Sequence, residues 1–137
     1  MPRVCIIDYG VGNLLSLKVA LEKTGLDVII KPSNEKIEDN DAIALPGVGN
    51  FSAATQALNP IKNKLGEIAK TGIPILGICL GLQLFFRISD EGPGEGLGFF
   101  DGKNVRLTGA VKIPHMGWNA LKMVKQNELF TGIENGT

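Results

Sequence analysis

The sequence is poor in three things: cysteine, net charge and long apolar runs. Its two cysteines, Cys5 and Cys79, make neither a disulfide framework nor a metal-ligand pattern. The 14 basic residues balance 14 acidic ones, and they are scattered rather than gathered into a basic surface. We therefore expect no metal and no nucleic-acid partner.

The absence of long apolar runs bears on location. No run reaches the ~18 residues of a membrane span. The first residues, Met1-Pro2-Arg3-Val4, do not have the build of a signal peptide. Together with the scarcity of cysteine, this predicts a reduced, cytoplasmic protein with no membrane partner.

A dinucleotide-binding fingerprint is also missing. Gly10-Val11-Gly12 begins such a pattern, but Leu15 stands where the third glycine should be. No phosphate-binding P-loop pattern occurs either. We expect no cofactor.

Short apolar runs that alternate with helical patterns are what the sequence does contain. This alternation predicts an α/β fold, with helices on both faces of a mostly parallel sheet. We expect the flavodoxin-like doubly wound order. Asn13 is a good N-cap for the first helix, which Gly25 closes. The predicted strands are 4–8, 27–31, 41–45 and 73–78, and the predicted helices are 14 to about 24, 51–58, 60–71 and 80 to about 88.

The texture changes after Ser89. Residues 90–98 read as a long turn-rich loop, and residues 103–107 and 111–114 look like antiparallel strands at the edge of the domain. A short helix begins at Glu128. No internal repeat is visible, and we expect one domain over residues 1–137.

The most informative motif is Gly77-Ile78-Cys79-Leu80-Gly81, where a predicted strand ends and a predicted helix begins. A cysteine between two glycines at such a junction is the cysteine form of the nucleophile elbow. The glycines relieve crowding, the helix N-terminus favours the thiolate, and the Leu80 N–H would be free for an oxyanion. The competing interpretation is a buried structural cysteine in a glycine-rich turn.

Two further features belong to the same predicted sheet edge. Pro46-Gly47-Val48-Gly49 follows the third strand, and a backbone N–H near Val48 or Gly47 is a candidate second oxyanion donor. Gln83 follows Cys79 by about one helical turn and could hydrogen-bond a polar substrate. The alternatives are a plain strand-to-helix turn and an ordinary surface glutamine.

A thiolate nucleophile needs a base, normally histidine. The only histidine is His115, in Pro114-His115-Met116-Gly117-Trp118-Asn119. Its edge-strand setting gives no support for that role.

The elbow, extended through Gln83 and preceded by the Pro46–Gly49 motif, resembles the class I (triad) glutamine amidotransferases. The motifs at 8–13 and 114–119 make the chain similar to the glutaminase subunits of imidazole glycerol phosphate synthase. Four separated motifs in one register carry the resemblance.

The resemblance implies a mechanism in which the Cys79 thiolate attacks the side-chain amide of glutamine, ammonia leaves, and a glutamyl thioester is hydrolysed. It implies an oxyanion hole from Gly47, Val48 and Leu80. Gly49 and Gln83 would contact glutamine. Ammonia would pass to a (β/α)₈-barrel cyclase subunit, with the interface near Asn13, Met116 and Trp118.

The resemblance also implies a base in a His-Pro-Glu motif, and none occurs in these residues. We therefore expect residues 1–137 to be the N-terminal part of a glutamine amidotransferase type 1 domain, with almost no glutaminase activity alone. Two alternatives stay open: a small cysteine hydrolase of similar fold with His115 as base, and a non-catalytic module that binds the cyclase.

Overall fold

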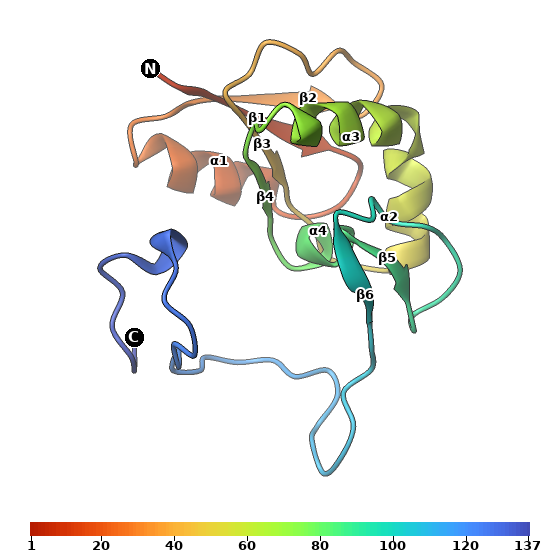
Figure 1. The fold of residues 1–137 in the computed structure, drawn as a ribbon, viewed down its shortest axis with the longest axis vertical. Helices are drawn as coiled ribbons and strands as arrows, with labels where there is room; N and C mark the ends of the chain where they lie inside the picture. The colour runs from red at the N-terminus through yellow and green to blue at the C-terminus, as the bar shows by residue number, and fades with distance from the viewer. The chain divides into compact units, whose positions relative to one another are not determined.

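Four short strands form a parallel sheet in the order β2-β1-β3-β4 (Figure 1). In this computed structural model, which describes residues 1–137, they are β1 (Arg3–Asp8), β2 (Asp27–Pro32), β3 (Ala42–Leu45) and β4 (Ile75–Gly77). The central strand β1 pairs with β2 from Arg3↔Asp27 to Asp8↔Pro32, and with β3 through Val4↔Ala42. The predicted parallel, doubly wound order is confirmed.

Both faces of the sheet are covered, which explains why β1 reads as a continuous apolar run. Cys5 and Ile7 point into the larger core, on the face covered by α2 (Phe51–Leu58), the 3₁₀ turn η1 (Asn59–Ile61) and α3 (Lys62–Lys70). Val4 and Ile6 point to the other face, against α1 (Leu14–Glu22). The Asn13 side chain accepts from the Ser16 backbone N at 3.0 Å, as the N-cap prediction requires.

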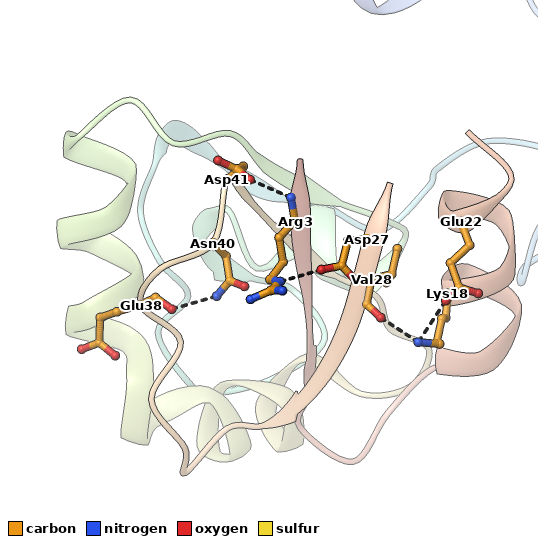
Figure 2. Close-up of polar contacts among 8 residues, drawn as sticks. All are labelled: Arg3, Lys18, Glu22, Asp27, Val28, Glu38, Asn40 and Asp41. Carbon is orange, nitrogen blue, oxygen red and sulfur yellow. Dashed lines mark hydrogen bonds and ion pairs between the residues drawn. The ribbon is translucent and has the colours of Figure 1, made fainter. Parts of the chain in front are cut away.

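A polar cluster joins the amino ends of the strands (Figure 2). Arg3 donates twice: its backbone N–H to Asp41 at 2.6 Å, and its side-chain Nε to Asp27 at 2.7 Å. Lys18 pairs with Glu22 on α1 and donates to the backbone oxygen at the second position of β2. These contacts tie β1 to β2 and to the residue before β3, and β2 to α1, at the edge opposite Cys79. Solvent screens exposed pairs of this kind, so each contributes little to stability.

The structure differs from the prediction after Cys79. The helix α4 covers only Leu80–Gln83, and β5 (Phe86–Ser89) replaces the rest of the predicted helix. The reason is the returning chain: the N–H groups of Leu97 and Phe99 donate to the carbonyls of Leu84 and Phe85, both at 2.7 Å. Those carbonyls are therefore unavailable to continue a helix.

The predicted antiparallel pair at 103–107 and 111–114 is wrong. The strand is β6 (Phe100–Asn104), and it pairs with β5 in parallel. The loop between them crosses over α2, where Ser52 donates to the carbonyl of Pro93, so the chain returns in the same direction as β5. Residues 111–114 form no strand.

Residues 107–137 form a second compact unit, distinct from Met1–Arg106. Its one regular element is the 3₁₀ turn η2 (Glu128–Phe130), where the short helix was predicted. Leu121 exchanges backbone hydrogen bonds with Thr137 and Gly136, at 2.9 and 2.8 Å. No side chain of this unit is buried. No helix of either unit is both long and apolar enough to cross a membrane.

Candidate active site

Cys79 lies at the sharp turn between β4 and α4. Its backbone has φ 55° and ψ −112°. Asp39 is the only other non-glycine residue with a positive φ. Such a conformation is strained and persists only where the surroundings enforce it. The thiol is exposed, so the buried structural cysteine is excluded as an interpretation of Cys79.

The flanking glycines are required by close contacts, as predicted. A Cβ on Gly81 would lie 1.8 Å from the carbonyl oxygen of Leu45, and a Cβ on Gly77 would lie 2.7 Å from the ring of Phe85. The Ile78 N–H donates to the same Leu45 carbonyl at 3.0 Å, so β3 holds the chain up to the residue before Cys79. β3 therefore leaves no room for a larger residue at position 81, and the segment that begins with α4 leaves none at position 77.

The Pro46–Gly49 loop lies against the elbow, as the sheet-edge argument predicts. A Cβ on Gly47 would lie 2.9 Å from the Cβ of Leu80 and 3.3 Å from the N of Gly81. Gly49 adopts φ +127°, which only glycine adopts readily, and Val48 is 67% exposed. The oxyanion candidates Gly47, Val48 and Leu80 therefore belong to two adjoining segments.

The Leu80 N–H is not free, contrary to the sequence-based expectation. It donates to the Gly47 carbonyl at 3.4 Å. The physical reason is the close approach of the two segments, which turns the Gly47 carbonyl toward the start of α4. At this length the hydrogen bond is weak.

The helix dipole that points at Cys79 is also smaller than expected, because α4 has only four residues. What distinguishes the two cysteines in the structure is access. Cys5 is fully buried in the main core, and burial raises the pKa of its thiol. Cys79 is the exposed one.

Gln83 closes α4 and is half-buried. Its N–H donates to the Cys79 carbonyl at 3.0 Å, so it lies one turn from the thiol, as predicted. Its carbonyl accepts from Nδ2 of Asn104 at 2.9 Å. Sequence reasoning missed Asn104, because the contact depends on the unexpected return of β6 beside β5.

Tyr9 is a second residue that the sequence analysis passed over. Its hydroxyl donates to the carbonyl of Pro46, and the side chain is only 4% exposed. Burial raises its pKa above the ordinary value for tyrosine, and the charge of Cys79 adds to that shift. The sequence did offer one signal for Tyr9, because the residue lies in the glycine loop after the first strand, at the same sheet edge as Cys79.

Glu91 reaches the neighbouring loop from the segment after β5. Its carboxylate accepts from the N–H of Phe51 at 3.2 Å, at the start of α2. The sequence had indicated only a turn-rich loop here.

The predicted interface residues fall in different units. Asn13 lies in the first unit, at the start of α1. Met116 and Trp118 lie in the second unit, and both are exposed, Trp118 completely. His115 also belongs to the second unit, where its Nε2 lies 3.0 Å from Nδ2 of Asn119.

An exposed cysteine on a strained strand-to-helix turn, at the carboxyl edge of a parallel sheet and beside a glycine loop, defines a class of α/β proteins with a thiol nucleophile. A family model agrees with this geometry: "Glutamine amidotransferase class-I" matches residues 5–137. The chain therefore belongs to the class-I glutamine amidotransferase family.

Curated relatives narrow the assignment to the HisH branch of that family. The chain is 47% identical, over its whole length, to the imidazole glycerol phosphate synthase subunit HisH of Pyrococcus furiosus, of which it covers 68%. It is 44% identical to the HisH subunit of Methanocaldococcus jannaschii, over 96% of this chain and 67% of that one. The chain thus spans about two thirds of the length of these relatives.

A solved structure is similar as well. The structure of PurLQS from Thermotoga maritima matches with a TM-score of 0.59 and 25% identity, over 74% of this chain and 47% of that one. The match supports the fold assigned from the strand order.

Proposed function

We propose that this chain carries the glutaminase nucleophile of an imidazole glycerol phosphate synthase. Its reaction is the hydrolysis of glutamine to glutamate and ammonia, and a cyclase subunit uses the ammonia to make imidazole glycerol phosphate in histidine biosynthesis. The observation that carries the proposal is Cys79, exposed on its strained turn against the Pro46–Gly49 loop.

In the proposed reaction the Cys79 thiolate attacks the side-chain amide carbon of glutamine. The carbonyl oxygen becomes an oxyanion. As the C–N bond breaks, the amide nitrogen takes up one proton, equivalent to the proton that the thiol lost, and leaves as ammonia. Water then hydrolyses the glutamyl thioester. The thiol is accessible for this attack because no core residue covers it.

The oxyanion would replace the Gly47 carbonyl as acceptor of the Leu80 N–H. That exchange costs little, because the existing 3.4 Å hydrogen bond is weak. Turning the Gly47–Val48 peptide would at the same time point the Val48 N–H at the oxyanion. Each such donor stabilises the transition state by ~3 kcal/mol.

Gly49 and Gln83 would bind the substrate. Gly49 leaves the loop backbone open to a close approach, since nothing lies within 4 Å of its missing Cβ. Gln83 stands one turn beyond the thiol, with its backbone fixed at both ends by Cys79 and Asn104. Its amide could then bind the polar groups of glutamine.

The catalytic base would lie in a His-Pro-Glu motif, which these 137 residues do not contain. The residues would form the N-terminal part of a single glutamine amidotransferase type 1 domain. Without that base, proton transfer to the leaving ammonia loses a factor of ~10²–10⁴. This chain alone should therefore hydrolyse glutamine barely faster than its Cys79→Ala variant.

The partner would be a (β/α)₈-barrel cyclase subunit, contacted near Asn13, Met116 and Trp118. Exposed Met and Trp side chains fit such a role, because these residue types are enriched at protein interfaces.

Glutamate release, measured for the chain with and without the cyclase, tests the function. We expect only trace turnover from the chain, and loss of that trace in Cys79→Ala. Robust turnover that needs no cyclase and disappears in His115→Ala would support the small cysteine hydrolase instead. Turnover that survives Cys79→Ala would overturn both.

A further inference from the structure

Tyr9 connects the loop after β1 to the loop beside Cys79. It follows β1 directly, its ring packs in the main core, and its hydroxyl donates to the carbonyl of Pro46. We propose that Tyr9 is a positioning residue that holds the Pro46–Gly47 peptide against the elbow, so that the loop can stabilise an oxyanion. This inference rests on the proposed function.

The contacts around Gly47 support this role. A Cβ on Gly47 would lie 2.6 Å from the Tyr9 hydroxyl and 2.9 Å from the Cβ of Leu80. Gly47 is therefore enclosed between the phenol on one side and the start of α4 on the other. Moving the hydroxyl away would leave the Gly47 peptide free to shift from the elbow.

A second contact comes from the same loop. A Cβ on Gly12, which has φ +91°, would lie 3.0 Å from the N of Gly47 and 3.2 Å from the Cβ of Pro46. The loop after β1 thus touches the Pro46–Gly47 peptide at two points. Beyond it, Val48 is two-thirds exposed, so little else restrains the loop on that side.

The chemistry of Tyr9 fits a donor and not a base. Burial raises its pKa, and a negative charge on Cys79 raises it further. The phenol therefore stays protonated near neutral pH. Proline has no N–H, so its carbonyl is the one backbone polar group by which Pro46 can be held.

The test compares two reactions of Cys79 in the full 137-residue chain. Acetylation by 4-nitrophenyl acetate passes through an oxyanion, and the nitrophenolate leaves without help from an acid. Alkylation by iodoacetamide forms no oxyanion. Both rates are read from the mass of the Cys79 peptide, and neither requires turnover of glutamine.

For Tyr9→Phe we expect acetylation to fall about tenfold or more, since small displacements of catalytic groups cost up to ~10²-fold. Alkylation should stay within about twofold of the wild-type rate. The matched control is Thr55→Val, which removes another largely buried hydroxyl that donates to a backbone carbonyl, that of Ser52. It should change neither rate.

Equal changes in both rates, or no change in either, would overturn the role of Tyr9. The wild-type chain distinguishes this failure from failure of the proposed function. If its acetylation-to-alkylation ratio equals that of free cysteine, there is no oxyanion site to position and both proposals fail. If the wild-type ratio is raised and Tyr9→Phe keeps it, only the Tyr9 proposal fails.

Discussion

The two units of this chain differ in how their side chains are placed. In Met1–Arg106 a parallel sheet is covered on both faces, and residues such as Ile6, Ile7 and Leu45 are fully buried. In Leu107–Thr137 no side chain is buried, and apolar residues such as Trp118 and Val124 face outward. All the ion pairs of the structure belong to the first unit.

This difference separates two kinds of functional residue. Cys79 is held in a strained conformation because β3, β4 and the Pro46–Gly49 loop surround its turn. Such strain requires a packed unit. Met116 and Trp118 need only be accessible, and a unit without a core can present them. The proposed chemistry therefore falls on the first unit, whereas two of the three proposed partner residues, Met116 and Trp118, fall on the second.

The largest expected contrast is in amide hydrogen exchange. Amides of β1 and β3 are hydrogen-bonded between buried strands and should exchange only when the first unit opens. Most amides of 107–137 should exchange near the unfolded rate. We expect protection factors that differ by ~10³ or more, measured by mass spectrometry. Equal protection in both units would contradict the comparison.

A second contrast uses glycine substitutions. Gly81→Ala places a Cβ 1.8 Å from the Leu45 carbonyl, so the elbow must shift, and we expect a loss of about 3 kcal/mol. Gly109→Ala meets nothing within 4 Å, and the strain from its φ of +93° is confined to the second unit, so the melting temperature of the first unit should stay unchanged. Thermal melts followed by circular dichroism measure both. A tolerated Gly81→Ala would mean that the turn is not as tight as described.

Trp118→Ala tests whether the second unit contributes to partner binding and not to stability. The side chain is fully exposed, so the melt should not change. If Trp118 anchors the cyclase, its loss should weaken that complex by ~2 kcal/mol. Calorimetric titration against the cyclase measures this. A large drop in melting temperature with unchanged affinity would make Trp118 a structural residue instead.

The smallest effect concerns acid. Arg87 donates to Glu95 at 2.6 Å and, with the charge of Lys62, lowers the pKa of that carboxyl below its usual range. A carboxyl whose pKa is lower in the folded state stabilises the fold at pH values above its unfolded-state pKa. That stabilisation is lost as the pH falls through the folded-state pKa. The melting temperature should therefore decrease once the pH falls below the ordinary glutamate pKa of about 4.3, and Glu95→Gln should flatten part of that slope. An unchanged slope would mean that this pair contributes nothing.

The sequence predicted the fold where local pattern and burial agree. Strands β1, β2 and β3 and the Asn13 N-cap of α1 follow from apolar runs and turn residues that indicate the same structure. The elbow was predictable because the crowding around the turn admits only glycine at positions 77 and 81, and both glycines are visible in the sequence.

What sequence reasoning missed depends on contacts between distant segments. The end of α4 is set by hydrogen bonds from residues 97 and 99, which no local pattern encodes. The hydrogen bond from the Tyr9 hydroxyl to the Pro46 carbonyl was missed for the same reason. The residues next to Tyr9 in the sequence do not indicate which distant carbonyl accepts it.

The central claim is that Cys79 is the reactive thiol of a nucleophile elbow. The direct measurement is alkylation by iodoacetamide near neutral pH, with both cysteine peptides followed by mass. Cys79 is exposed, while Cys5 is buried with a raised pKa, so we expect Cys79 to react at least ~10²-fold faster. Equal rates for Cys5 and Cys79 in the folded chain would contradict the account.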